Sequence, residues 1–235
     1  MPSSSVNNTY VIPDYVIICT FISCGLSLIG CMGLLATYIR VSIIRNYIRQ
    51  LLMFLTLANF IHVCADMTGM FMYVSMRSYN DSTNRYYARF DEMCVTQGLM
   101  SSYAPMVEFL WSTVIAVYFH ANVLHTSVHQ QFATTRSKLI SHCCCWIIPA
   151  IVCAFGLYYG VFGETRDLFI SPGCWIDTDY LSKNDQILWM MLTKIGLECV
   201  TFLVVTEVAV FTGWKLLILP IWKPGTRPSQ VWGRV

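Results

Sequence analysis

Five ionisable side chains lie inside long apolar stretches of the sequence, where charged residues are otherwise rare: Asp66, Glu108, Lys194, Glu198 and Glu207. A charge at the centre of a membrane-spanning helix costs about 2.5 to 3.5 kcal/mol on insertion scales, so such residues often mark an ion path, a ligand site or a helix contact. Lys194 and Glu198 stand four positions apart, which predicts either an internal ion pair or a role toward a ligand or another helix. Asp66 and Glu108 have no charged partner nearby in the sequence, and we expect both to face the interior of a helical bundle.

Motifs for enzyme chemistry are absent from the sequence, which has no Gly-rich phosphate loop, no H-E-x-x-H and no G-x-S-x-G. We therefore expect neither an enzyme nor a cofactor, and we expect no nucleic acid as a partner. His120, His125 and His129 crowd the inner end of one apolar stretch. A zinc site would need a further ligand nearby, so the pattern favours a cytosolic boundary cluster over a metal site.

Three consecutive cysteines, Cys143–Cys145, occupy the inner end of another apolar stretch. Cysteines close to a membrane surface are substrates for reversible palmitoylation. Free cysteines also behave as small apolar residues that fill space in a core. Both interpretations fit the sequence.

The elements that position these residues are five apolar segments. Of the 235 residues, 56% are hydrophobic and 12% are charged, about half the charged fraction of a soluble domain. A helix needs about 20 residues to cross the roughly 30 Å of hydrocarbon in a bilayer. The sequence therefore predicts an all-α, polytopic transmembrane helical bundle with spans at Tyr15–Ile39, Leu51–Met76, Val95–Leu124, Leu139–Phe162 and Gln186–Trp214.

The distribution of basic residues sets the orientation of the spans. With the N-terminus outside, the outer segments hold five basic residues and the cytosolic segments hold nine, which satisfies the positive-inside rule. The nine cytosolic bases are Arg40, Arg45, Arg49, Arg136, Lys138, Lys215, Lys223, Arg227 and Arg234.

Two further features fall on the outer side in this topology. The glycosylation sequons begin at Asn7 and Asn80. Cys94 and Cys174 also lie at the outer membrane face, where an oxidising lumen favours a disulfide between them over two free thiols. Such a bridge would pin the second outer loop, which has a turn signal at Ser171–Gly173, over the third span.

The chain thus divides into three parts. Residues 1–13 form a short extracellular segment, residues 14–215 form the membrane domain, and residues 216–235 form a cytosolic tail. Pro220, Pro224 and Pro228 argue against a continuous helix in the tail, which we expect to be interfacial or disordered.

Several sequence blocks resemble G-protein-coupled receptors of the secretin-like and cAMP-receptor-like branch. Together they extend over most of residues 15–200. The blocks are Gly173–Asp177 with Ile187–Lys194, Phe109–Trp111 with Ala116–Tyr118, Leu51–Asn59, and the pair Trp146 and Pro149 of the fourth span.

The sequence departs from this family at several points. Asn59 stands where the most similar receptor has an acid, and Ile115 stands where secretin-like hormone receptors keep a buried glutamate. The resemblance fades from about Cys199 onward. The sequence also has five spans where the family has seven, so we expect either a truncated receptor or a short isoform that modulates a full-length one.

The resemblance implies a receptor in the plasma membrane, surrounded by lipid. Its expected partners are a heterotrimeric G protein, an unknown extracellular ligand and possible further receptor copies in an oligomer. The ligand pocket would lie among spans two, three and five, with candidate residues Tyr103, Trp175, Asp177, Trp189 and Lys194. The candidates that would face the G protein are Arg45, Arg49, Arg136 and Lys138.

Two other classes of membrane protein fit some of these features. A small transporter or channel subunit would use Asp66 and Glu108 as a proton or cation path, but it predicts inverted repeats, and five spans divide poorly into halves. A four-helix scaffold of the tetraspanin kind predicts a larger second outer loop with more cysteines than Cys174 alone.

Overall fold

The computed structural model describes residues 13–41, 47–78, 84–124, 134–164, 174–177 and 181–222. The predicted sites at Asn7, Arg45 and Asn80 lie outside these residues, as do His125 and His129.

Five helical segments are long and apolar enough to cross a membrane, as the hydropathy of the sequence predicts. Each has the length that a bilayer requires, and its backbone hydrogen bonds close within the segment. The fourth and fifth spans are each built from two α-helices joined by a short π-helical turn. The elements are α1 Asp14–Arg40, α2 Tyr47–Ser78, α3 Asn84–Leu124, α5 Thr135–His142, η2 Cys143–Ile147, α6 Ile148–Tyr158, α7 Lys183–Met190, η3 Met191–Ile195 and α8 Gly196–Trp222.

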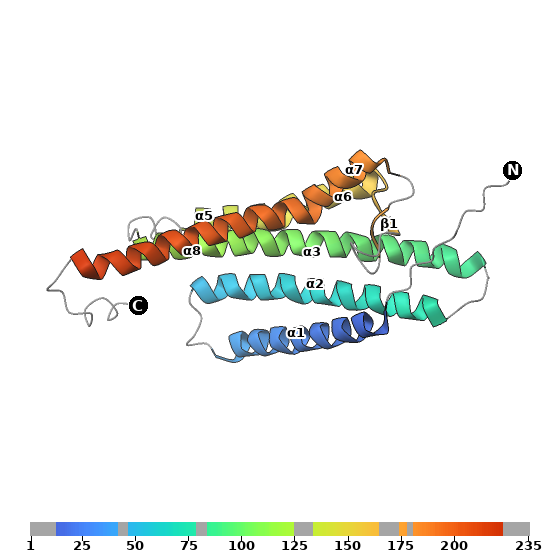
Figure 1. Cartoon of the computed structure of the whole chain (residues 1–235), viewed down its shortest axis with the longest axis horizontal. Helices are drawn as coiled ribbons and strands as arrows, with labels where there is room; N and C mark the ends of the chain where they lie inside the picture. The colour runs from blue at the N-terminus through green and yellow to red at the C-terminus, as the bar shows by residue number, and fades with distance from the viewer. Residues whose placement is uncertain are drawn as a thin grey trace.

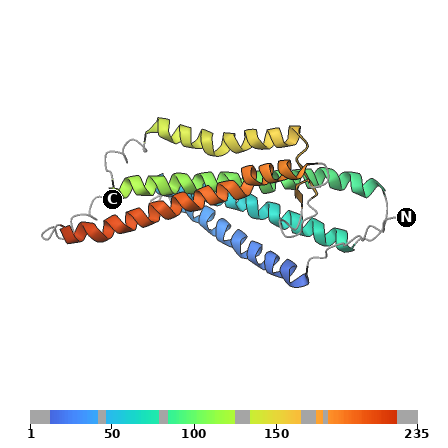
Figure 2. The same ribbon diagram turned by 45° about the horizontal axis from the view of Figure 1, so that its top comes forward.

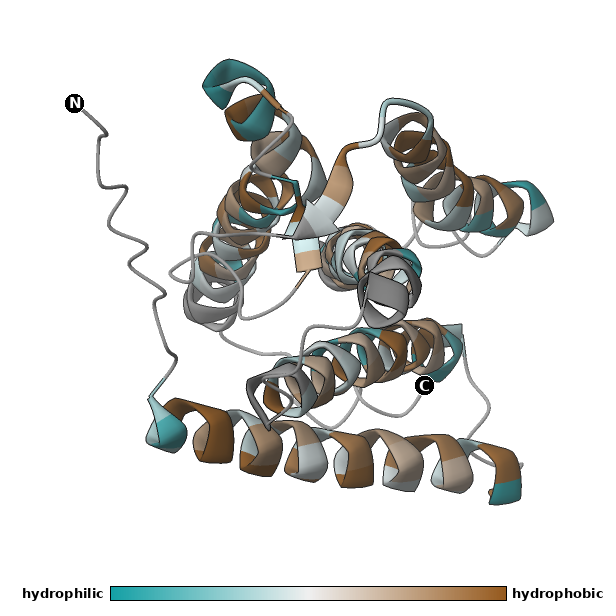
Figure 3. Cartoon of the chain, turned by 90° about the vertical axis from the view of Figure 1, so that its right-hand side faces the viewer, coloured by the Kyte–Doolittle hydropathy of each residue, from teal (hydrophilic) through white to brown (hydrophobic). Residues whose placement is uncertain are grey.

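Helix α3 is the central element of the bundle. In Figures 1 and 2, α2 and α1 lie on one side of α3, the fourth span lies on another, and α8 runs alongside it. Viewed from the end that carries the hairpin strands, apolar residues cover much of the helix surfaces, including those of α1 at the edge of the bundle (Figure 3). Such surfaces suit contact with lipid tails.

The largest buried cluster joins α2, α3 and the fourth span around Trp111. This side chain is 0% exposed, and its ring stacks on Phe54 with 5.2 Å between centroids. The His142 ring meets Trp111 edge-on at 5.1 Å. Because lipid tails are as apolar as these side chains, the cluster stabilises the bundle through close packing more than through removal from water.

A two-stranded hairpin follows the fourth span at the outer end. Strand β1 (Phe162–Glu164) pairs antiparallel with β2 (Cys174–Ile176), and Gly163 lies opposite Trp175. The sequence signalled only a turn in this loop, because strands of three residues are too short to show an alternating pattern.

Several helix boundaries differ from the predicted ones. The fourth span was expected to end at Phe162, but its helix ends at Tyr158 and Phe162 lies in β1, because Gly160 adopts a positive φ of 63° that ends the helix. Helix α3 begins at Asn84, although the span was expected to begin at Val95, so the helix extends well beyond the predicted membrane boundary. The fifth span was expected to end at Trp214, whereas α8 continues to Trp222, into the segment that we expected to be an interfacial or disordered tail. Pro220 has no N–H to donate to the carbonyl four residues before it. Because it lies in the last turn of α8, this loss affects only the end of the helix.

Candidate functional site

A disulfide fastens the outer hairpin to the central helix. Cys94 of α3 and Cys174 of β2 are bonded, with 5.1 Å between their Cα atoms and 80 residues between them in the sequence. Both cysteines are buried and pack with Met72 of α2. The structure thus joins the two outer-face cysteines that the sequence singled out.

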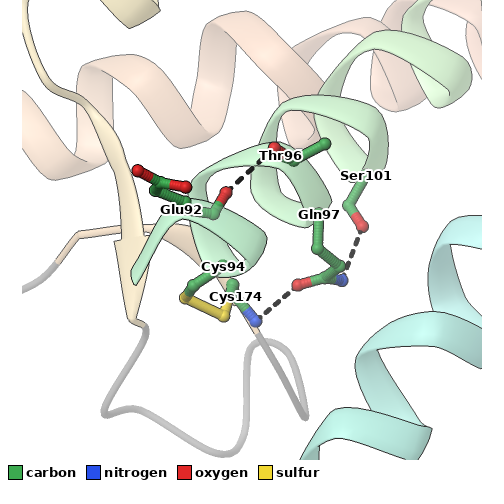
Figure 4. Close-up of a disulfide and its surroundings, with 6 residues drawn as sticks. All are labelled: Glu92, Cys94, Thr96, Gln97, Ser101 and Cys174. Atoms are coloured by element: carbon green, nitrogen blue, oxygen red, sulfur yellow. Dashed lines mark hydrogen bonds between the residues drawn. A yellow bond between two sulfur atoms is a disulfide. The ribbon is translucent and has the colours of Figure 1, made fainter. Parts of the chain in front are cut away.

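Gln97 adds a second attachment one turn further along α3, and sequence reasoning missed it. Its Oε1 accepts a hydrogen bond from the backbone N–H of Cys174 at 2.7 Å, and its Nε2 donates to the Ser101 hydroxyl at 2.9 Å (Figure 4). The Gln97 side chain is buried, so both ends of its amide are satisfied where water is scarce. Its position three residues after Cys94, on the same helical face, was the available signal.

Glycines allow the hairpin to lie directly on the helix backbone. A Cβ atom placed on Gly98 would lie 2.8 Å from the carbonyl oxygen of Trp175, closer than real contacts allow. A Cβ atom on Gly163 would lie 2.6 Å from Oδ2 of Asp177. The disulfide, the Gln97 bond and the Gly98 contact hold the hairpin as a fixed cover on α3, which we call the hairpin lid (β1, β2 and Asp177).

Four of the five predicted ligand residues gather around this hairpin lid. Trp175 is 2% exposed and its indole N–H has no hydrogen-bond partner among the described residues, while the Lys194 ammonium lies 5.7 Å from the centroid of its ring. Trp189 packs against the buried cluster that contains Trp175. The backbone N–H of Asp177 donates to the carbonyl of Val161 at 2.8 Å. The lid therefore brings together a cation, two indoles and a carboxylate.

The fifth predicted ligand residue, Tyr103, lies below the lid. It packs against a cluster that includes Phe162 of β1, and its hydroxyl donates to the carbonyl of Trp146 at 3.4 Å. Its polar end is therefore directed to the fourth span.

The predicted Lys194–Glu198 ion pair is absent from the described residues, where Lys194 contacts Trp175 instead. Lys194 belongs to the π-helical turn η3, whose wider winding alters the i,i+4 alignment on which the prediction relied. Glu198 and Glu207 are both exposed on the surface of α8, as expected for a fifth span with few neighbours.

A polar cluster at membrane depth corrects the prediction for Asp66 and Glu108. His62 has one ring nitrogen, Nδ1, 3.1 Å from Oε2 of Glu108 and the other, Nε2, 3.6 Å from Oδ2 of Asp66. Asp66 therefore does have a sequence-local partner, because His62 precedes it by four positions on the same helix. The expected interior position is also wrong for Asp66, whose side chain is 45% exposed.

Two grooves flank α2 and α3. The outer groove has a volume of about 520 Å³ and lies beside the disulfide; its lining includes Met72, Met93, Met100, Glu92 and Gln97. The inner cavity of about 570 Å³ opens between α1, α2 and α3, with Arg49, Asn59 and Glu108 in its lining. Neither lining includes any of the five predicted ligand residues.

The basic candidates on the cytosolic side lie at the ends of two spans. Arg49 and Arg136 are exposed near the starts of α2 and α5. The Lys138 ammonium lies 4.6 Å from the centroid of the Tyr47 ring, and Tyr47 in turn meets Tyr118 of α3 edge-on at 4.9 Å. These contacts connect the inner ends of α2, α3 and the fourth span.

Three polar contacts join helix α8 to α3 within the described residues. The Thr201 hydroxyl lies 3.4 Å from both the Thr113 hydroxyl and the carbonyl of Phe109. Further toward the cytosol, Nδ1 of His120 lies 3.0 Å from the Thr212 hydroxyl. Polar contacts of this kind hold transmembrane helices together with modest strength.

Comparison with known proteins shows which proteins this chain resembles. No family model matches the chain. The chain is 27% identical over 172 residues to G-protein coupled receptor 157 of Homo sapiens, and 26% identical to the proteins of that name from Mus musculus and Rattus norvegicus. These matches cover 73% of this chain and 46 to 47% of the relatives, so the chain spans about half the length of the curated relatives it matches. The secretin-like branch stays a prediction. The chain is thus an integral membrane protein whose described residues include five helical spans, and it resembles G-protein coupled receptor 157 over nearly three quarters of its length.

Proposed function

We propose that this chain acts in a G-protein-coupled receptor that transmits an extracellular signal to a heterotrimeric G protein. The observation that carries the proposal is the similarity to G-protein coupled receptor 157. The hairpin lid, fixed to α3 by the Cys94–Cys174 disulfide, supports it because a rigid outer cover can hold a ligand against the helix ends.

The ligand site is the outer groove between α2 and α3 together with the hairpin lid. Gln97 lines the groove and also bonds to the lid, and Met72 lines the groove and also packs on the disulfide. A ligand in the groove would therefore contact the residues that anchor the lid. Methionine side chains adapt to different apolar shapes, while Glu92 and Gln97 supply polar groups at one end.

Residues of the hairpin lid and of the fifth span beside it form the second part of this site. Trp175, Asp177, Trp189 and Lys194 offer a buried indole donor, a carboxylate, a second indole and an ammonium. A ligand acts by binding one of two helix arrangements more tightly than the other.

A ligand-induced change in helix arrangement would reach the cytosol through helix α3. It carries Cys94 and Gln97 at its outer end, Glu108 against His62 in the membrane, and Tyr118 against Tyr47 at its inner end. Arg49, Arg136 and Lys138 supply positive charge beside that inner end, and we propose that they face the G protein.

Proximity measurement in living cells tests the G-protein assignment. The chain with a C-terminal luciferase is co-expressed with a panel of fluorescent Gα subunits, and energy transfer is measured at equal surface expression. We expect specific transfer to at least one Gα, and a loss of that transfer in the double variant Arg136→Ala/Lys138→Ala. Lys183→Ala, which removes an outer base, is the matched control. Transfer no higher than that of an unrelated membrane protein, for every Gα, contradicts the proposal.

The sidedness of the chain has a separate test. We propose a plasma-membrane location with glycosylation at Asn7 and Asn80. Treatment with an N-glycosidase should increase gel mobility, and the shift should disappear in Asn7→Gln/Asn80→Gln. Protection of the segment around Asn80 from externally added protease in intact cells, together with its cleavage from the cytosolic side, contradicts the orientation.

A further inference from the structure

The inner end of the fourth span carries a run of cysteines with contrasting surroundings. All nine free cysteines of the chain have a described environment, and Cys143 and Cys144 are adjacent and both exposed. Cys145 directly follows them and is 1% exposed, inside the Trp111 cluster. One turn of helix therefore presents two accessible thiols and one inaccessible thiol.

The two exposed thiols lie close to the cytosolic surface. Arg136 and Lys138 in the first turn of α5 mark the membrane boundary, and Cys143 follows Lys138 by five residues, which is about 7.5 Å of helix rise. Side chains on a helix tilt toward its N-terminus, and the N-terminus of this span is the cytosolic end. The thiols therefore point back toward the surface where soluble acyl donors are available.

An apolar ridge on the same helix surface continues from these cysteines into the membrane. Ile140, Ile147 and Ile151 are exposed, at four residues before, three after and seven after Cys144. Like Cys144, all three are exposed, so they share the uncovered surface of this span. A hydrocarbon chain attached to Cys144 would lie along this ridge in contact with lipid.

Disulfide formation, metal binding and core packing do not account for the two exposed thiols. The reducing cytosol keeps thiols on this side of the membrane from forming stable disulfides. Within the described residues, no group of three metal-ligating side chains could hold a metal ion. The two thiols also lie outside the buried Trp111 cluster, so packing does not explain them as it explains Cys145.

We propose that Cys143 and Cys144 are S-acylated by long-chain fatty acids. The cysteine thiolate attacks the thioester carbonyl of an acyl-coenzyme A, a new carbon–sulfur bond forms to the cysteine, and the bond to the coenzyme A sulfur breaks. Coenzyme A leaves as its thiol with the proton that the cysteine gave up, so no oxidant or reductant is required. The attached chain anchors the inner end of the fourth span in the cytosolic leaflet.

Metabolic labelling of the full chain tests this proposal. Cells that express the chain receive an alkyne analogue of palmitate, and the label on the purified chain is measured before and after hydroxylamine, which cleaves thioesters. We expect a hydroxylamine-sensitive label that falls to the background of untransfected cells in Cys143→Ser/Cys144→Ser. Cys19→Ser is the matched control, because Cys19 is an exposed thiol near the outer end of α1 and its loss should leave the label unchanged.

Single variants keep the test decisive if the double variant fails to reach the membrane. Each of Cys143→Ser and Cys144→Ser retains one acceptor, so each should show reduced but measurable label per chain. An unlabelled wild-type chain at the cell surface overturns the proposal, and so does full label on Cys143→Ser and on Cys144→Ser alike. A label that resists hydroxylamine also overturns it, because such a label is not a thioester.

Discussion

The hairpin lid and helix α8 both contact α3, but by different means. The lid is attached by a covalent bond, by the buried Gln97 amide and by backbone contact at Gly98. Helix α8 is attached by non-covalent contacts alone, which are hydroxyl and imidazole contacts together with apolar packing such as that of Leu197, and most of its described side chains are exposed.

This difference separates a fixed part of the molecule from a movable one. A helix held by a few weak polar contacts can change its position at small cost, whereas a covalently held lid cannot. In the receptor that we propose, the lid would keep the outer site in shape while α8 shifts against α3.

Loss of the disulfide should have the largest effect. Removing a native disulfide typically costs about 2 to 5 kcal/mol of stability. We expect Cys94→Ser and Cys174→Ser to lower the unfolding temperature in detergent equally, because each removes the same bond, as followed by tryptophan fluorescence. The double variant should be no worse than either single one. Clearly unequal single variants would show that the two cysteines do not act as a pair.

Adding a side chain at Gly98 should have the next largest effect. In Gly98→Ala the new Cβ atom meets the Trp175 carbonyl, and overpacking of this kind costs about 1 to 3 kcal/mol. Gly30→Ala is the control, because a Cβ atom there meets nothing within 4 Å. We expect faster reduction of the Cys94–Cys174 bond by an external reductant in Gly98→Ala only. Equal reduction rates in both variants would mean that the lid is not held against the helix backbone.

Disruption of the polar cluster around His62 should have the third largest effect on stability. His62→Leu leaves Glu108 and Asp66 without their imidazole partner, and hydrogen bonds between transmembrane helices average about 0.6 kcal/mol with values up to about 1.7. We expect a lower unfolding temperature in His62→Leu and partial recovery in His62→Leu/Glu108→Gln, because the second change removes a stranded carboxylate. No recovery in the double variant would place the destabilisation elsewhere in the site.

The sequence predicted the features that depend on composition over many residues. Hydropathy located all five spans, because membrane thickness fixes the length of apolar helix that each needs. Cys94 and Cys174 stood out because they are the cysteines at the outer face. Features that depend on short-range geometry were missed: the three-residue strands carry no periodic pattern, and the π-turn that redirects Lys194 has no sequence signal. His62 was detectable four residues before Asp66, but a histidine does not stand out as the partner of a carboxylate in the way that a lysine or an arginine does.

The loss of a single polar contact of α8 gives the sharpest test of the contrast between lid and helix. Thr212→Val keeps the shape of the side chain and removes the hydroxyl that contacts His120, so the cost in stability should be about 0.6 kcal/mol. Thr20→Val is the control, since the Thr20 hydroxyl donates to the carbonyl of Val16 in its own helix. Double electron–electron resonance between spin labels on α3 and α8 should show a broader distance distribution in Thr212→Val and an unchanged one in Thr20→Val. Because a movable helix responds to the loss of one weak bond while a fixed one does not, an unchanged distribution in Thr212→Val would mean that α8 is held by lipid-facing packing rather than by its polar contacts with α3.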